Sequence, residues 1–263
     1  MSVQLPESRD KKCRMCGMQR PLIKAHVIPE AFFRPLRDGE QAPKIFSAGK
    51  EPPKKSPIGI YDETILCKEC ETKFDAIDSY GTAVFLSDFH RHFSLVQHAD
   101  GVHAFESESV DQTRLLRFLI AVLWRASVST HPFYRAVELG PFERPAVATI
   151  QHPHQPIPPL FSALLARWLS TPDLEYASKS IGSPGKQRID GANVYRFHLG
   201  QVVALIRASK TPFLDARARL SVGAQEKLFL IGPSFEESQD LQSMVSTAKA
   251  SFAAHPPRGR RSK

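Results

Sequence analysis

The four cysteines of the sequence fall into two CxxC pairs, and this spacing favours a metal site. The pairs are Cys13 with Cys16 and Cys67 with Cys70. A CxxC turn lets two thiolates converge on one tetrahedral ion, and two such turns complete a closed four-thiolate shell. We therefore expect one structural zinc ion held by all four cysteines. A redox-active pair is the alternative for either CxxC taken alone.

A histidine, His26, lies between the two cysteine pairs in the apolar stretch AHVIP. Three roles are open for it: a packed core histidine whose ring nitrogens bond backbone carbonyls, a fifth zinc-ligand candidate, or a catalytic base. Because the four cysteines already fill a closed site, His26 is not needed as a zinc ligand. The choice between the other two roles depends on the elements around it.

The composition is that of a globular protein with a basic excess. The 263 residues are 42% hydrophobic and 24% charged, and the formal net charge is +8. The longest strongly apolar run, residues 118–124, is too short to cross a bilayer, and the N-terminus lacks an apolar signal-peptide core. We expect a cytoplasmic protein with no membrane partner, whose basic charge permits a polyanionic partner.

The apolar patterns predict the elements that position these residues. Short strands are expected over 21–28 and 60–66, beside the two cysteine pairs. Between them, residues 38–59 are rich in Pro, Gly and Lys and are expected to be a mobile connection. Residues 71–89 carry apolar side chains near helical spacing. The clearest helix, over 111–129, has Asp111 as its N-cap and a wide apolar face, so we expect it to be central and buried.

The second half of the chain is predicted to add more helices and a β-hairpin. Expected there are a short helix over 160–169, a hairpin over 194–207 around Gly200, a strand over 226–232 and a helix over 236–252. The fold class is then α+β: a zinc-bound ββα-metal, treble-clef-like module followed by a helical and mixed α/β part. The expected domains are a lead-in (1–12), the module (13–86), a region packed on it (87–252) and a basic disordered tail (253–263).

The order of these motifs resembles the HNH, or ββα-metal, endonucleases in their zinc-stapled form. Ala25-His26-Val27-Ile28-Pro29 matches the family's histidine motif, and Leu66-Cys67-Lys68-Glu69-Cys70 matches its second cysteine motif. The match covers residues 13–86. The wider chain is similar to a group of bacterial proteins labelled HNH-like.

This resemblance implies a metal-dependent endonuclease that hydrolyses phosphodiester bonds in nucleic acid, with DNA as the expected form. His26 would be the general base. Asp62 and Glu71 stand near the family's asparagine and final histidine, and both are oxygen ligands suited to a catalytic Mg²⁺ or Mn²⁺ ion. Ala25 stands where the family has a metal ligand. The candidate contacts to nucleic acid are Lys24, Lys54, Lys55 and Lys73.

Two other functions stay open. A non-catalytic module that keeps the zinc and binds nucleic acid or protein is favoured by the missing ligand at Ala25. In the third hypothesis the chain is a subunit or regulator, and its C-terminal part carries the function. The sequence gives no oligomeric state.

Overall fold

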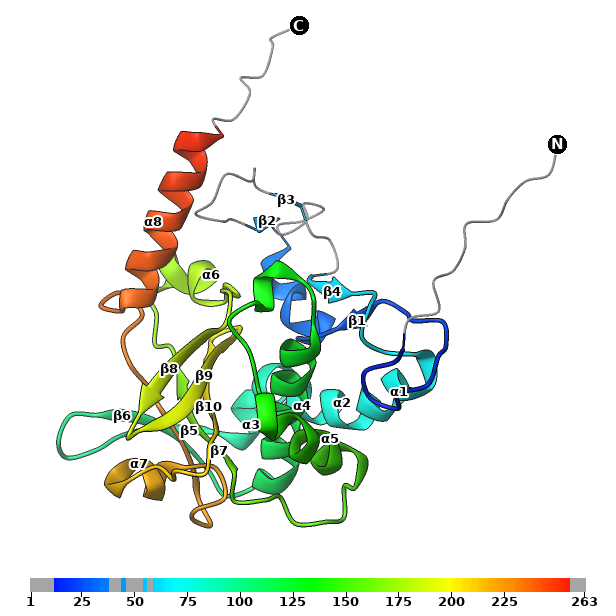
Figure 1. The fold of residues 1–263 in the computed structure, drawn as a ribbon. Helices are drawn as coiled ribbons and strands as arrows, with labels where there is room; N and C mark the ends of the chain where they lie inside the picture. Colours follow the sequence, from blue (N-terminus) through cyan, green and yellow to red (C-terminus); the bar gives the residue numbers. More distant parts are fainter. Residues whose placement is uncertain (1–11, 38–43, 46–53, 56–58, 256–263) are drawn as a thin grey trace, which may run out of the picture.

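The computed structural model describes residues 12–37, 44–45, 54–55 and 59–255, the two short internal pairs as backbone only. Helices and one seven-stranded sheet make up most of it, and the cysteine-bearing segment lies at the opposite side of the helices from the sheet (Figure 1). This mixture of helices and strands agrees with the expected fold class at that level. In the described ranges no helix is long and apolar enough to span a membrane.

The sheet has the strand order β5-β6-β11-β7-β10-β9-β8. Its neighbouring strands pair antiparallel, except for β7 and β11, which are parallel. Gly200, with φ +64°, turns the chain between β9 and β10, so the predicted hairpin is confirmed. The strands in spatial order are Ser94–Gln97 (β5), His103–Ser107 (β6), Leu228–Ile231 (β11), Phe161–Arg167 (β7), Val202–Ala208 (β10), Ala192–Leu199 (β9) and Gly185–Ile189 (β8).

The expected helix over 160–169 is wrong, because this segment forms the central strand β7. Leu and Ala favour helices in isolation. Here, however, the segment lies between β10 and β11, and its residues alternate between the two faces of the sheet. Phe161, Ala163 and Leu165 are buried, whereas Leu164 and Ala166 on the other face are half-buried. Tertiary pairing overrides the local preference.

The helix α4 (Gln112–Val128) is the centre of the fold, as its sequence predicts. The Asp111 side chain caps it by accepting from the Arg114 backbone N–H at 3.0 Å. Almost every residue from Leu115 to Val128 is buried. One side packs on β7 and β10, and α2 (Asp75–Thr82) and α5 (Glu143–Gln151) flank it.

The N-terminal segment contains shorter elements than its sequence suggests. The two expected strands reduce to residue pairs, Ala25–His26 (β1) and Tyr61–Asp62 (β4), which pair antiparallel. The expected connection over 38–59 lies largely outside the described residues, and its described parts pair as Lys44–Ile45 (β2) with Lys54–Lys55 (β3). The helical stretch that begins at Lys68 divides into α1 (Lys68–Glu71), a 3-10 turn (Thr72–Phe74), α2, a π-helical turn (Ala83–Ser87) and α3 (Phe89–His92).

One continuous hydrophobic core joins this segment to the sheet. It extends from Cys13 and Phe74 through Trp124 to Leu165 and Leu230. The Phe74 ring stacks on Trp124 of α4 with centroids 6.0 Å apart. Three helices lie at the periphery: the short α6 (Glu175–Ser178) and α7 (Asp215–Leu220), and the longer α8 (Gln239–Ala254).

Gly81 sets how closely α2 approaches α4, and this contact can be tested. A Cβ built at Gly81 would lie 2.2 Å from the Phe118 ring, which is itself fully buried. We expect Gly81→Ala to lower the free energy of unfolding by about 1–3 kcal/mol through overpacking. The matched control is Gly185→Ala, since a Cβ there meets no atom within 4 Å. Urea unfolding that gives equal stability for both variants would contradict the close packing of α2 on α4.

Candidate metal centre

Two short turns carry the cysteines. In the first, the Cys13 carbonyl accepts from the Gly17 N–H at 2.8 Å, and Gly17 takes a φ of +70°, which favours glycine. In the second, Cys67 precedes α1 and its carbonyl accepts from the backbone N–H groups of Cys70 and Glu71. A bridge between Leu22 and Cys67 aligns the two turns.

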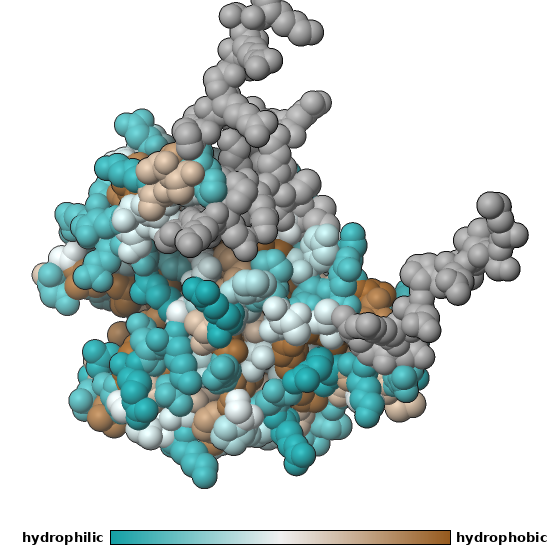
Figure 2. Space-filling model, turned by 45° about the horizontal axis from the view of Figure 1, so that its top comes forward, coloured by the Kyte–Doolittle hydropathy of each residue, from teal (hydrophilic) through white to brown (hydrophobic). Residues whose placement is uncertain are grey.

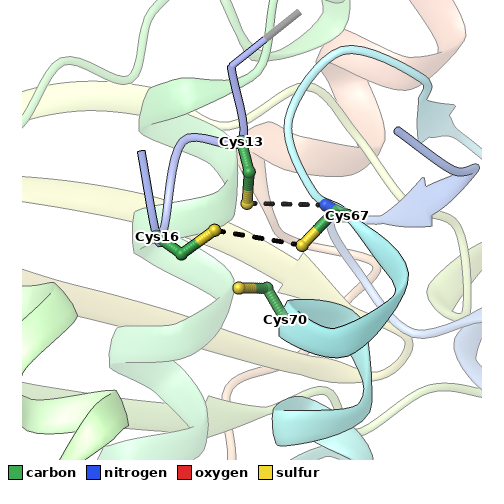
Figure 3. Close-up of side chains that lie close together, drawn as sticks. All are labelled: Cys13, Cys16, Cys67 and Cys70. Carbon is green, nitrogen blue, oxygen red and sulfur yellow. Dashed lines mark hydrogen bonds between the residues drawn. The ribbon is translucent and has the colours of Figure 1, made fainter. Parts of the chain in front are cut away.

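The turns bring four sulfur atoms into one cluster. All four Sγ atoms lie within 4.8 Å of one another, and Figure 3 shows them pointing toward a common centre. The Sγ atoms of Cys16 and Cys67 are 4.0 Å apart. Four thiolates about 2.3 Å from a tetrahedral zinc ion would be about 3.8 Å apart, so the cluster fits such an ion. Cys13, Cys67 and Cys70 are buried and Cys16 is half-buried, which is typical of a closed site.

The protein around the cluster changes the acidity of the thiols. Burial raises the pKa of Cys70, and the neighbouring thiols raise it further. Burial also raises the pKa of Cys13, but hydrogen bonds from backbone N–H groups, including those of Cys16 and Cys67, outweigh it and lower the pKa to about 7. Because a metal ion binds thiolates, its binding would release protons from the cluster.

His26 lies on the outer face of the β1–β4 pair. It stands directly opposite Tyr61, and the two rings meet edge to face with centroids 6.2 Å apart. The His26 side chain is half-buried. The ammonium group of Lys24 lies 4.9 Å from the centre of the Tyr61 ring and 3.7 Å from a Glu63 carboxylate oxygen. An imidazole, a phenol ring and an ammonium group therefore share one surface.

Asp62 is opposite Ala25 and on the inner face, where it is 4% exposed. Its carboxylate accepts from the backbone N–H and the hydroxyl of Thr64 at 2.7 and 2.6 Å. It also accepts from the Ser129 hydroxyl and the Thr130 N–H, both at 2.7 Å. Burial alone raises the pKa of Asp62, but these hydrogen bonds outweigh it and hold the pKa below its usual value. Asp62 thus ties β4 to the residues just after α4.

Glu71 lies at the end of α1, close to the backbone of His26. The His26 N–H donates to its carboxylate, and its Oε2 is buried with no hydrogen-bond partner among the described residues. Burial raises the pKa of Glu71 to about 7, although Arg125 opposes this shift. The Arg125 guanidinium is fully buried and donates to both carboxylate oxygens of Asp78, at 2.7 and 2.6 Å.

Of the three residues expected at a catalytic centre, the structure brings together only two. Glu71 contacts the His26 main chain, whereas Asp62 faces the opposite side of the β1–β4 pair from the His26 ring. Adjacent residues of a strand point to opposite faces, and Asp62 pairs with Ala25 rather than with His26. Among the described residues, the cysteine cluster is the group in which three or more potential metal-ligating side chains lie close enough to share one ion.

The four lysines expected to contact nucleic acid are not equally described. Lys24 and Lys73 are exposed, on the β1 side of the segment and after α1 respectively. Lys54 and Lys55 form β3, and their side chains lie outside the described part of the chain.

The sequence pattern hardly indicated that two arginines of α4 are buried. Arg125 and Arg117 both lie on the buried face of α4. Arg125 is paired with the Asp78 carboxylate, whereas Arg117 donates to the backbone carbonyls of Thr149 in α5 and of Gln155 in the loop that follows it. The position of Arg125 between the apolar residues Trp124 and Ala126 was the one sign in the sequence that this arginine is buried. A buried charge needs a partner, so it also indicated a nearby carboxylate.

Comparisons with known proteins give no further guide. No family model, no curated protein and no solved structure matches this chain.

The Asp62 hydrogen bonds can be tested by mutation and pH. We expect Asp62→Asn to cost about 1–3 kcal/mol of unfolding free energy at about pH 7, because donors from Thr64, Ser129 and Thr130 lose a charged acceptor. The folded-state pKa of Asp62 is depressed. Its contribution is therefore present above the unfolded pKa of about 3.9 and is lost as pH falls through the folded value.

Urea unfolding at about pH 7 and about pH 3 measures this difference. The control is Glu63→Gln. The Glu63 carboxylate is exposed and pairs only loosely with Lys24, so this substitution should change the free energy of unfolding by no more than about 0.5 kcal/mol. A gap between parent and Asp62→Asn that does not narrow at low pH would contradict the assignment.

Proposed function

We propose that the four cysteines hold a structural zinc ion and that the surface of β1 and β4 beside it binds nucleic acid. The zinc proposal is supported by the closed set of four converging thiols, the ligand set that zinc uses in structural sites. In this proposal the ion supplies folding energy to a segment whose strands are only two residues long.

The observation that carries the binding proposal is the shared surface of Lys24, His26 and Tyr61. An exposed ammonium group can contact a phosphate, and a neighbouring aromatic ring can stack on a base. Lys24 is 58% exposed, and its pairing with Glu63 is long and solvent-exposed, so a phosphate can compete for it. The net charge of +8 favours a polyanion in general.

The residues do not fit a catalytic Mg²⁺ or Mn²⁺ ion as they are arranged. Such ions need several oxygen ligands around one point. The Asp62 carboxylate is engaged by Thr64, Ser129 and Thr130, and Ala25 has no donor atom. Binding without cleavage, the HNH-like module serving as a scaffold, is therefore the function we favour.

Cleavage of nucleic acid, with His26 as general base, is our second proposal. It is favoured by one observation: Glu71, whose pKa is raised to about 7, contacts the main chain of His26. Strongly perturbed carboxyl groups beside a histidine are common at catalytic sites, although buried charge networks also produce them. A site of this kind would need its further metal ligands from water or substrate.

The zinc proposal predicts one zinc ion per chain. We expect native mass spectrometry and elemental analysis to find it in protein purified without chelators, and Cys67→Ser to lose it and unfold the N-terminal segment. Cys67 is fully buried, so the loss of folding could reflect packing alone. The half-buried Cys16→Ser variant supplies the second measurement: it should also lose zinc while disturbing the core less. Full zinc content in both variants would rule the site out.

The binding proposal predicts a salt-dependent affinity for DNA. Fluorescence anisotropy with a labelled oligonucleotide should show weaker binding for Tyr61→Ala by about 1–3 kcal/mol, since a stacked ring is lost, and a smaller loss for Lys24→Ala. Lys186→Ala is the matched control, because Lys186 also lies over a tyrosine ring, at 5.8 Å from Tyr195, but on the distant strand β8.

Equal losses for Lys24→Ala and Lys186→Ala would exclude this surface as the binding site. The same DNA incubated with Mg²⁺ or Mn²⁺ separates our two proposals. Strand cleavage that His26→Ala slows by about 10²–10⁴-fold, while the exposed-histidine control His90→Ala does not, would select the second proposal. Binding without cleavage selects the first.

A further inference from the structure

The face of the seven-stranded sheet turned away from α4 carries a groove. It lies between α7 and the first turn of α8 and has a volume of about 740 Å³. Figure 2 shows a hollow at the left of the molecule with hydrophobic surface on both of its sides. The volume falls within the range of about 300–1,000 Å³ that small-molecule sites occupy.

The floor of the groove is apolar because of strand alternation. On each central strand, one set of side chains enters the main core, as Leu165 and Leu230 do. The other set faces the groove, and it includes Leu164, Leu205 and Phe229. Leu205 and Phe229 are only half-buried. Three neighbouring strands thus present an apolar surface that the two helices leave uncovered.

The rim of the groove supplies hydrogen-bond donors. Trp168 lines the groove and is 7% exposed, and its Nε1 has no acceptor among the described residues. Arg196 also lines it, and its Nε is likewise buried without an acceptor there. Arg217 of α7 is 55% exposed and bonds Asp190 through Nη1 at 3.0 Å, which leaves other guanidinium donors.

Two carboxylates, of Asp240 and Glu237, lie on the same rim. Arg196 donates to the Asp240 carboxylate, which neutralises its charge locally. Glu237 is exposed, so solvent screens its charge. Arg217 is paired with Asp190 in the same way, so the rim has no surplus of positive charge. It does have unused hydrogen-bond donors, namely the remaining guanidinium N–H groups of Arg217, Trp168 Nε1 and Arg196 Nε. Donors of this kind beside an apolar floor are complementary to an apolar molecule that carries a hydrogen-bond acceptor such as a carboxylate.

We propose that this groove binds a small amphipathic monocarboxylate, with its apolar body on Leu164, Leu205 and Phe229 and its carboxylate at Arg217. A planar guanidinium suits a carboxylate, since it can donate two parallel hydrogen bonds. The apolar body gains by leaving water, in proportion to the area that the floor covers. This site is separate from the cysteine cluster and does not depend on the function proposed for it.

Calorimetric titration of the full chain with naphthalene-1-acetate, and with the uncharged 2-(1-naphthyl)ethanol, tests this proposal. We expect the carboxylate to bind with one-to-one stoichiometry and more tightly than the alcohol. Leu205→Asp should abolish binding of both, because it places a charge on the apolar floor. Arg217→Gln should weaken the carboxylate about tenfold and leave the alcohol unchanged, since a charged hydrogen bond is lost.

The matched control is Leu214→Asp. Leu214 is 51% exposed and lies just before α7 but outside the groove lining, so binding should be that of the parent. Circular dichroism confirms that each variant is folded. No binding to the parent, or unchanged binding in folded Leu205→Asp, would overturn the site. Equal affinity for the two compounds, or an equal effect of Arg217→Gln on both, would overturn the assignment of the carboxylate to Arg217.

Discussion

The convergence of four thiols from two distant turns is the constraint on which the N-terminal side of this molecule depends. Cys16 and Cys67 are 51 positions apart, yet their sulfur atoms are 4.0 Å apart. The strands between them contribute little to this order, since β1 and β4 are two residues long each. Without a metal ion, four crowded thiols contribute little attraction, and burial raises the pKa of Cys67 and Cys70. With one, the thiolate–metal bonds would fix both turns at once.

Two buried polar contacts then attach this segment to the central helix. The Arg125 guanidinium, which lies 4.5 Å from the centre of the Phe74 ring, holds Asp78 of α2 through two hydrogen bonds. The Asp62 carboxylate holds Ser129 and Thr130 at the opposite end of the same segment. Removing one partner of the Arg125–Asp78 pair would leave a charge uncompensated, which is far more costly than the pair is favourable. The two contacts thus hold α2 and β4 against α4.

This arrangement bears directly on function. A carboxylate that serves as a structural tie has few lone pairs left for a metal ion, and Asp62 accepts four close hydrogen bonds. Asp62 cannot easily both attach β4 to α4 and bind a catalytic ion, because each role uses the same carboxylate oxygens. The outer face of β1 and β4 is under no such demand, and there Lys24, His26 and Tyr61 lie together.

Patterns that depend on neighbours in sequence were predictable, and those that depend on distant partners were not. The CxxC spacing, the Asp111 cap and the Gly200 hairpin each involve a few consecutive residues, and each appears where it was expected. The segment 160–169 became a strand because β10 and β11 lie on either side of it. The inward orientation of Asp62 depends on its register with Ala25 and on hydroxyl groups 67 positions away. No local pattern encodes such a contact.

Hydrogen–deuterium exchange of the full chain, with its metal and after chelation, tests the central claim most directly. If a metal ion at the four cysteines orders the N-terminal segment, chelation should raise exchange in residues 13–36 and 59–86. Strands β7, β9 and β10 should keep their protection, because their pairing and core do not include the thiols. Unchanged exchange in 13–36 and 59–86 after complete removal of the metal would contradict the account.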